Sequence, residues 1–480
     1  MRRILVRTAV GLAAAACLFP STTTAQGFGV YEQGACVMGR AGTGVAKPCA
    51  DGSSIFFNPA NIADTPDVLS LGGTLIAPRG TFTNDLTGIQ SKLEDKYRPV
   101  PNVYLVKSVN LAGTVNRVAF GAGLFVPYGL TTEWPDTSEA RFLGYRSDIR
   151  AIYVQPTVAL QLNHRVSIGA GLDINFAHVQ LRQRVDLSTQ LLPPIPPLPA
   201  GATFASLGVA TGTDFADANL DGNSTHLGFH VGLSAKVTDW LDVGARYLSR
   251  QSVSFDNASV TIAQVPTNLV VPVAIGPIPA GTPVDALVAP QFTGSGPLTN
   301  QTASTVIHLP DQAVFGVAVR PVPRLTLLTD VQYTHWKYFD SVAISFEKLP
   351  PEVLHQDNHD IWDLRLGGEF AANESITLRG GWYLHNGAEP DYAVTPNLPE
   401  GDRSSFTVGI GARVSRGFRI DAAYQYINQG DRRGRSVALV GYPAGCDIAN
   451  GAACPALTQQ NNGLYSFHAH LFGATFSYAF

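Results

Sequence analysis

Residues 165–179 read RVSIGAGLDINFAHV, and the alternation within them decides the fold class. Apolar residues occupy every second position from Val166 to Phe176, and small or polar residues, Asp173 among them, occupy the positions between. A period of two is the pattern of a β-strand whose two faces meet different surroundings. The run is longer than the five or six residues of an ordinary strand, which favours a strand that crosses a membrane.

Charged residues share one face of these segments. By parity they fall opposite Leu172, Val331 and Leu378. The set on the charged face is Asp173, Arg246, Asp330, Asp363, Arg365, Glu369, Arg379, Arg413 and Asp421. A transmembrane β-barrel turns an uncharged face to lipid and a polar face to its lumen. A soluble β-sandwich also alternates, but only 15% of this chain is charged, against about 25% in typical soluble domains.

Similar segments recur through the rest of the chain. They span 67–78, 98–109, 116–127, 148–162, 164–184, 224–237, 240–256, 303–320, 323–346, 358–371, 374–387, 403–415, 418–429 and 464–480. Short connections alternate with long ones, as in a barrel with both termini on the periplasmic side. The chain ends on the aromatic Phe480, as strands of outer-membrane proteins commonly do. The sequence therefore predicts an all-β fold, a 14-stranded antiparallel transmembrane β-barrel over residues 67–480.

The first residues predict export. Residues 1–25 combine a basic head, an apolar run from Ala9 to Phe19 and a small residue at Ala25, which is the pattern of a secretory signal peptide. No later stretch approaches the roughly 18 consecutive apolar residues that a membrane helix needs. Acidic residues number 37 and basic residues 33, so the composition gives no sign of a nucleic-acid partner.

Four cysteines remain after the signal, in two local pairs. Cys36 and Cys49 form one pair, and Cys446 and Cys454 form the other. In an exported protein such pairs predict two disulfides, with the pairing inferred from proximity. Zinc is the competing interpretation, although no histidine lies near either pair at ligand spacing. We expect neither a metal nor a cofactor.

The stretch SSIFFNPA, residues 53–60, lies before the first strand. Asn58 can cap a helix through its side-chain oxygen, and Pro59 suits the first helical position. A helix start beside two buried aromatic residues, Phe56 and Phe57, is the local interpretation. It leaves open what the segment does within a barrel.

Residues 27–63, GFGVYEQGACVMGRAGTGVAKPCADGSSIFFNPANIA, resemble the N-terminal hatch of the long-chain fatty acid outer-membrane transporter family, FadL/TodX and OmpP1-like proteins. Residues 121–130, GAGLFVPYGL, and residues 154–178 are also similar to that family. The resemblance implies a monomeric barrel in the outer membrane of a Gram-negative bacterium, plugged by a hatch over residues 26–66. Its expected partners are a hydrophobic small molecule, outer-membrane lipid and the barrel-assembly machinery. The Cys36/Cys49 pair is a departure from the family pattern.

The resemblance also implies a transport route. A long-chain fatty acid or another hydrophobic compound is captured in the lumen, the hatch rearranges, and the ligand leaves sideways where the third strand is kinked. Two apolar, proline-rich loop segments, 191–199 and 270–284, are either the collecting surface or an ordered loop crust. The predicted ligand-binding residues are Phe56, Phe57, Asn58, Pro59, Ala60, Arg365 and Arg379, with Gly121, Gly123 and Pro127 at the kink. For the two glycines, close packing against the hatch is the alternative.

Three other functions remain as alternatives. An uptake channel for aromatic hydrocarbons would share the fold. An outer-membrane lipid hydrolase would need a nucleophile and a base, but the chain has no Gly-x-Ser-x-Gly turn and only the weak pair Ser466 and His468. A general diffusion porin is disfavoured by the forty-residue plug. We therefore expect a transporter and not an enzyme.

Overall fold

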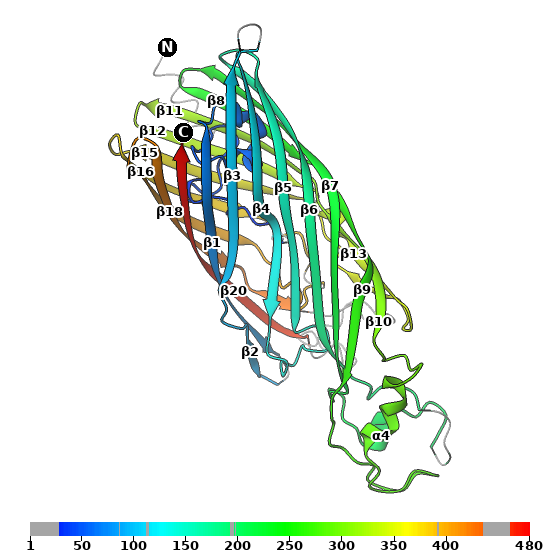
Figure 1. The fold of residues 1–480 in the computed structure, drawn as a ribbon. Helices are drawn as coiled ribbons and strands as arrows, with labels where there is room; N and C mark the ends of the chain where they lie inside the picture. The colour runs from blue at the N-terminus through cyan, green and yellow to red at the C-terminus, as the bar shows by residue number, and fades with distance from the viewer. Residues whose placement is uncertain are drawn as a thin grey trace.

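The computed structural model describes residues 28–85, 87–111, 115–192, 196, 198–390, 393–434 and 461–480. The strand segments are β1 Val68–Asn84, β2 Gln90–Lys92, β3 Arg98–Asn110, β4 Arg117–Glu133, β5 Arg146–Gln161, β6 Val166–Val185, β7 Ala216–Thr238, β8 Leu241–Leu248, β9 Gln251–Gln264, β10 Gln301–Leu309, β11 Gln312–Val322, β12 Leu325–Thr334, β13 Ser341–Phe346, β14 Glu352–His355, β15 Ile361–Ala371, β16 Ile376–His385, β17 Arg403–Arg413, β18 Phe418–Gln429, β19 Arg432–Gly434 and β20 Gly463–Ala479. They form one antiparallel wall (Figure 1). The expected signal peptide, residues 1–25, lies outside the described residues.

The wall closes into a barrel of 14 strands, which confirms the predicted fold class. β1 pairs with β20 along its whole length, from Val68 opposite Ala479 to Asn84 opposite Gly463. Three barrel strands are interrupted: β8 continues as β9, β10 as β11, and β12 as β13. Between β12 and β13 the chain makes the short helix η5, Trp336–Tyr338, where the sequence predicts an unbroken strand over 323–346.

Burial follows the predicted parity. Leu172 is 56% exposed on the outside of β6, whereas Asp173 is fully buried inside. Phe406 and Val408 on β17 are likewise exposed, and Thr407 between them is buried. The apolar face therefore covers the outside of the barrel and the polar face lines its interior. Arg413 differs from the other predicted lumen arginines, because it lies exposed at the end of β17.

The hatch folds inside the barrel (Figure 1). Its helical elements are α2 Ala35–Met38, α3 Ser54–Phe57 and η2 Pro59–Ala63. The Asn58 side chain accepts a hydrogen bond from the Ala60 amide at the start of η2, so the predicted cap is present and caps a 3-10 helix. Pro59 occupies the first turn of that helix.

Inward-facing glycines let the hatch approach the barrel backbone. They form a belt, called here the glycine belt: Gly121, Gly169, Gly232, Gly244, Gly316, Gly367, Gly381 and Gly409. A Cβ atom at Gly169 would lie 2.4 Å from the Pro59 carbonyl carbon, and one at Gly244 would lie 2.2 Å from the Val45 oxygen. Larger residues cannot fit at such positions while the hatch stays in place. The glycines of this belt thus leave the space that the hatch backbone occupies.

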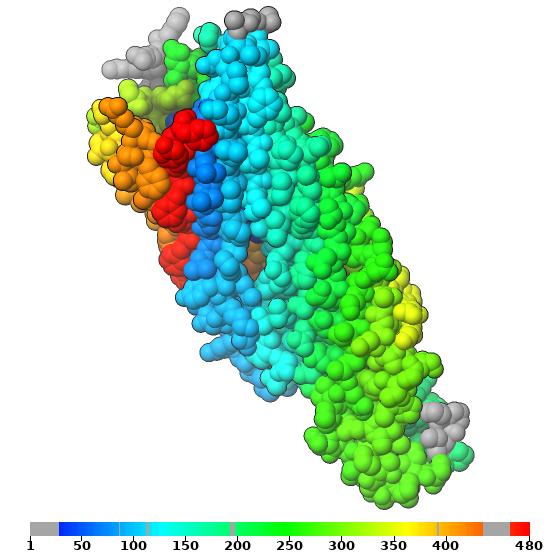
Figure 2. Space-filling view, viewed as in Figure 1, coloured from blue at the N-terminus to red at the C-terminus, as the bar shows by residue number. Residues whose placement is uncertain are grey.

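At the end of the barrel opposite the C-terminus, the long loops form a compact extension (Figure 2, green, lower end). It contains η3 Phe204–Leu207, α4 Val284–Val288 and η4 Ala289–Phe292. Phe204, Phe215, Val271 and Val288 are buried in a small core of their own. Among the described residues, no helix is long and apolar enough to cross a membrane.

Candidate functional site

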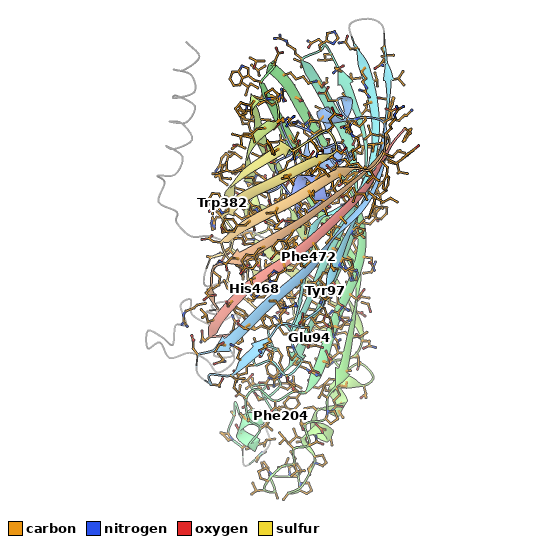
Figure 3. The ribbon with its side chains drawn as sticks, turned by 90° about the vertical axis from the view of Figure 1, so that its left-hand side faces the viewer. Glu94, Tyr97, Phe204, Trp382, His468 and Phe472 are labelled. Carbon is orange, nitrogen blue, oxygen red and sulfur yellow. A yellow bond between two sulfur atoms is a disulfide. The ribbon has the colours of Figure 1, made fainter. Side chains whose placement is uncertain are left out.

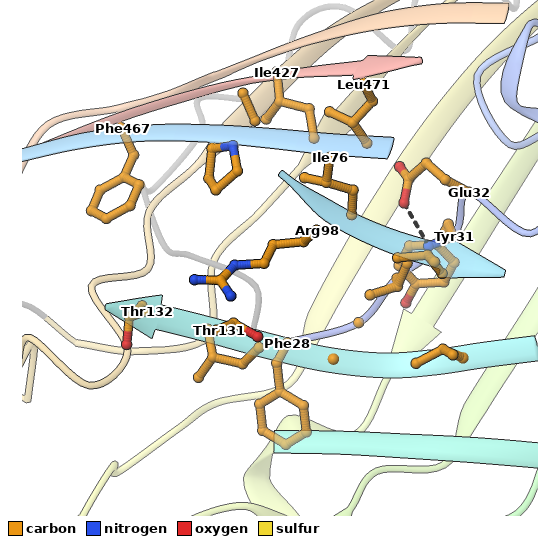
Figure 4. A pocket seen from close by; sticks show the side chains of 18 of the residues that line it. Phe28, Tyr31, Glu32, Ile76, Arg98, Thr131, Thr132, Ile427, Phe467 and Leu471 are labelled. Carbon is orange, nitrogen blue, oxygen red and sulfur yellow. Dashed lines mark hydrogen bonds between the residues drawn. The ribbon is translucent and has the colours of Figure 1, made fainter. Parts of the chain in front are cut away.

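A cavity of about 540 Å³ lies between the hatch and one side of the barrel. Phe28 to Glu32 of the hatch form its floor, and β1, β3, β4 and β5 form one wall. Residues of β16, β17, β18 and β20, and of the loop between β16 and β17, complete it. Figure 4 shows Phe467, Ile427 and Leu471 on one side, Phe28 and Thr131 on the other, and the Arg98 side chain between them. The lining is mainly apolar with a few charged groups, as is usual for ligand sites.

The cavity passes through the barrel wall between β3 and β4. Their pairing runs from Asn110 opposite Arg117 to Val103 opposite Leu124 and ends there. Among the barrel strands, residues 98–102 of β3 then pair with β1 alone, and residues 128–133 of β4 pair with β5 alone. Figure 1 shows the two strands diverging over this stretch. Because the cavity also touches Arg150 and Ile152, whose side chains are exposed on the outside of β5, it reaches the outer face of the wall.

The hatch fills the inner side of this gap. The amide of Val30 donates to the Pro127 carbonyl at 2.8 Å, and the amide of Gly129 donates to the Phe28 carbonyl at 2.9 Å. The hatch thus occupies the edge of β4 that β3 leaves unpaired. Val30 packs with Val100 and Val126 in a small buried cluster. Movement of residues 28–31 would therefore expose both the gap and the edge of β4.

A polar region lies across the cavity from the gap. It contains Tyr383 and His385 at the end of β16, Glu400 in the following loop, Arg403 at the start of β17 and Gln429 on β18. Arg403 Nη2 donates to Glu400 Oε1, and Arg403 Nε donates to Gln429 Oε1 at 3.2 Å. Glu400 is 3% exposed. Burial raises the pKa of the Glu400 carboxyl to about 8, against the lowering effect of Arg403 and Arg432.

The loop that carries Glu400 folds over the barrel opening. Asn397 Nδ2 donates to the Leu143 carbonyl at 2.8 Å, and Ser147 Oγ donates to Asn397 Oδ1 at 2.8 Å. Trp134 Nε1 donates to the Pro396 carbonyl at 3.0 Å. These contacts join the loop after β16 to the β4–β5 side of the barrel. They explain how residues far apart in sequence border one cavity. Figure 3 shows Tyr97 and His468, which line the cavity, well away from Phe204 in the loop extension.

The predicted ligand-binding residues of the hatch lie elsewhere. Asn58 Nδ2 donates to the carbonyls of Val45, at 2.8 Å, and Leu233, at 2.9 Å, and so ties the hatch to β7. Phe56 and Phe57 are buried against each other with ring centroids 5.0 Å apart. Pro59 and Ala60 pack against β6 at Gly169. None of these residues lines the cavity, so their contact with a ligand stays a prediction.

The two predicted lumen arginines of the site are both engaged. Arg379 donates to Glu369 at 2.9 Å and to Asp421 at 2.8 Å, so it forms the ion pairs expected of a buried charge. The Arg365 guanidinium lies 4.0 Å from the centroid of the Tyr31 ring. Tyr31 lines the cavity, whereas Arg365 lies behind it and Arg379 lies apart from it. A direct ligand contact for either arginine therefore also stays a prediction.

The three predicted kink residues divide into two groups. The β4–β5 register shifts between Phe125 and Tyr128, the interval that contains Pro127. Gly121 and Gly123 precede this irregularity, in the regularly paired part of β4. A Cβ at Gly121 would lie 2.9 Å from Ile55 Cδ1 of the hatch, and one at Gly123 3.1 Å from Ile55 Cγ2. Pro127 thus lies within the register shift and the two glycines lie against the hatch, while a role in a gate stays a prediction for all three residues.

One of the two predicted disulfides lies within the described residues. Cys36 and Cys49 are bonded inside the hatch, with their Cα atoms 6.2 Å apart. Asp51 lies close to both sulfur atoms, but disulfide sulfurs are not available as thiolate ligands. The Cys446–Cys454 pair falls outside the described residues.

A buried polar cluster on β5, β6 and β7 was not foreseen from the sequence. The Thr157 hydroxyl lies 2.9 Å from His230 Nε2, and His230 Nδ1 contacts the Asp173 carboxylate. Thr157, His230 and Asp173 thus follow the order of hydroxyl, base and acid that a catalytic triad has. All three are buried, and none lines the cavity described above. We assign the cluster to the inner wall.

Comparison with known proteins gives one family. The sequence profile of the outer membrane protein transport protein family (OMPP1/FadL/TodX) matches residues 16–480. The long-chain fatty acid transport protein of Escherichia coli strain K12 is 23% identical over 490 residues, with 98% of each chain covered. Outer membrane protein P1 of Haemophilus influenzae is 22% identical over 499 residues, again with 98% of each chain covered.

Solved structures share the fold. A Pseudomonas aeruginosa FadL homologue superposes with a TM-score of 0.75 at 18% identity, covering 95% of this chain and 100% of that one. The Pseudomonas putida toluene transporter TodX superposes with a TM-score of 0.64 at 16% identity, covering 93% and 98%. At these identities the likeness concerns the fold alone.

Proposed function

Because the chain belongs to the outer membrane protein transport protein family (OMPP1/FadL/TodX), we propose that it carries hydrophobic small molecules into the outer membrane and releases them sideways through the gap between β3 and β4. The observation that carries the proposal is a cavity that starts inside the barrel and reaches the outer face of its wall at this gap. A water-filled channel would not help a ligand that prefers lipid, whereas a lateral opening delivers it directly to the bilayer. The barrel acts as a monomer, inserted by the barrel-assembly machinery and surrounded by outer-membrane lipid.

The proposed route begins at the loop end and finishes at the gap. A ligand enters the barrel past the loop that carries Glu400. It binds in the cavity, where it lies against residues 28–31 of the hatch. Displacement of Val30 from Val100 and Val126 then opens the way to lipid. The rest of the hatch stays in the glycine belt, which holds it through close backbone contacts. Only the first residues of the hatch need to move.

Long-chain fatty acids are the proposed substrates, because the cavity joins an apolar end at Val100 and Val126 to a polar end at Arg403. Aromatic hydrocarbons are the second candidate, since the fold is shared with a toluene transporter. An uncharged aromatic ligand would leave the polar end of the cavity without a partner, and this favours an amphipathic substrate.

A disulfide between the hatch and β4 tests the route. In the variant Val30→Cys/Val126→Cys, the two new thiols replace side chains of one buried cluster. Oxidation should stop uptake of a labelled long-chain fatty acid into liposomes, and mild reduction should restore it. The unaltered protein, treated with the same oxidant and reductant, controls for the Cys36–Cys49 bond. Equal uptake by the cross-linked and reduced forms would exclude this lateral route.

A further inference from the structure

The polar end of the cavity holds an arginine whose charge is matched by a carboxyl group from the chain itself. Arg403 and Glu400 both line the cavity, and Arg403 Nη2 donates to Glu400 Oε1. The other carboxylate oxygen of Glu400, Oε2, is buried and has no hydrogen-bond partner among the described residues. A buried carboxylate normally has both oxygens engaged. The carboxyl group of the pair is therefore incompletely satisfied.

The other charged groups around Glu400 do not replace Arg403. Arg432 on β19 donates to the backbone carbonyls of Glu400, at 2.9 Å, and Glu389, at 2.8 Å. Glu389 is buried in the same loop, and burial raises the pKa of its carboxyl well above the ordinary value. His385 borders the cavity at the end of β16 and approaches Asp363 at 3.0 Å. Among the described residues, Arg403 is thus the cation that lines the cavity and hydrogen-bonds to the Glu400 side chain.

The remaining charged groups of the cavity have partners of their own. Arg98 donates to Glu133 at 2.8 Å, and Arg150 donates to Asp148 at 2.7 Å. Glu32, on the floor, accepts from the Tyr31 amide and from Gln425 (Figure 4 shows the first of these). His468 lies on β20 opposite Asn428 of β18, two strands from Arg403 on β17. The Arg403–Glu400 pair remains as the place where a ligand charge could be exchanged for a charge of the protein.

We propose that Arg403 binds the anionic head group of an amphipathic ligand, and that Glu400 is an internal competitor which occupies Arg403 when the ligand is absent. The ligand is a long-chain compound with a single negative charge, its chain directed toward Val100 and Val126 at the gap. The assignment rests on the proposed function, because it requires a hydrophobic ligand in this cavity. It adds a residue that distinguishes charged from uncharged ligands.

The competition depends on pH. Below the pKa of about 8, Glu400 is protonated, the charge of Arg403 is uncompensated, and the carboxyl can donate a hydrogen bond to the ligand. Above that pKa, Glu400 is ionised, pairs with Arg403 and repels an anion. Binding of an anionic ligand is therefore strong at low pH and weakens as the pH rises through about 8.

A ligand that does not itself titrate isolates the effect. The probes are a long-chain alkyl sulfonate, charged at every pH used, and the alcohol of the same chain length. With the purified full-length barrel, the sulfonate should bind about tenfold more tightly at about pH 6 than at about pH 10, as expected for loss of one charge-assisted hydrogen bond. The alcohol should bind equally well at both values.

Two variants assign the effect to its residues. Glu400→Gln should bind the sulfonate tightly at both pH values, because the amide cannot ionise. Arg403→Gln should weaken sulfonate binding at about pH 6 by about tenfold and leave the alcohol unchanged. Arg320→Gln is the matched control, since Arg320 pairs with Asp242 away from the cavity. Heat-modifiable migration confirms that each variant has folded.

The outcomes separate this inference from the proposed function. If the sulfonate binds equally at both pH values, or if Arg403→Gln binds it as tightly as the unaltered protein, the role of Arg403 and Glu400 is refuted. Binding and uptake of the alcohol would then still support transport of hydrophobic compounds. If neither probe binds, both the inference and the proposed function fail.

Discussion

The side-chain amide of Asn58 donates a hydrogen bond to the carbonyl oxygen of Leu233, 2.9 Å away, and so joins the hatch to β7 of the barrel wall. The same amide donates to the Val45 carbonyl within the hatch. A Cβ at Gly232, the neighbour of Leu233, would lie 2.1 Å from Asn58 Oδ1. The contact thus depends on an amide on one side and a glycine on the other.

Replacement of Asn58 by alanine should loosen the hatch and spare the barrel. The change removes this donor from the buried Leu233 carbonyl and leaves the Val45 carbonyl with the Asn61 side chain, and an unpaired buried polar group costs about 1–3 kcal/mol. We expect Asn58→Ala to insert and to resist heat like the unaltered protein, with increased ion leak and a several-fold change in fatty acid uptake. Unchanged leak and uptake in a folded variant would show that this contact does not hold the hatch.

A large residue at Gly121 should displace the hatch. Its Cβ would already lie 2.9 Å from Ile55 Cδ1, so the further atoms of Gly121→Leu have no room beside α3. We expect increased ion conductance and faster amide exchange in residues 54–63. Gly380→Leu is the matched control, because Gly380 faces outward on β16 and its nearest neighbour is 3.7 Å away. If both variants conduct equally, the glycine belt does not determine how the hatch is seated.

Loss of the hatch disulfide should act on the hatch alone. Cys36 and Cys49 are 13 positions apart in the sequence, and such a cross-link contributes about 2–4 kcal/mol. In Cys36→Ser/Cys49→Ser we expect faster hydrogen exchange over residues 35–51, while the heat stability of the barrel stays the same. Exchange at the original rate would indicate that the glycine belt alone holds this part of the hatch.

Arg379 should matter for assembly more than for ligand binding. Arg379→Met leaves the buried Asp421 without this partner and removes a partner from Glu369, and breaking a buried ion pair costs about 3–5 kcal/mol. We expect lower yields of folded barrel and a lower unfolding temperature, with unchanged ligand affinity in the folded fraction. A normal unfolding temperature combined with weakened ligand binding would instead place Arg379 in the ligand site.

Much of the fold follows from local sequence. In residues 165–179 the side chains alternate, and a strand turns alternate side chains to opposite faces whatever its neighbours are. Charges confined to one face identify that face as the lumen, because an unpaired charge on the lipid face is costly. The strand count, the inward direction of Asp173 and the cap at Asn58 therefore required no knowledge of distant contacts.

The position and lining of the cavity depend on the tertiary structure. Arg403 and Glu400 border it because the loop after β16 folds over the opening and is held there by Asn397, and no local pattern specifies where a long loop folds. The alternation of apolar and polar residues likewise does not reveal the gap between β3 and β4. Val100 and Val126 belong to apolar segments whether or not their two strands pair with each other. The edge of β4 can pair either with β3 or with another segment. Over this stretch, residues 28–30 of the hatch hydrogen-bond to it. Sequence periodicity reports the surroundings of each face of a strand, whereas a site assembled from a loop, a hatch and a break in the wall depends on contacts between residues far apart in the chain.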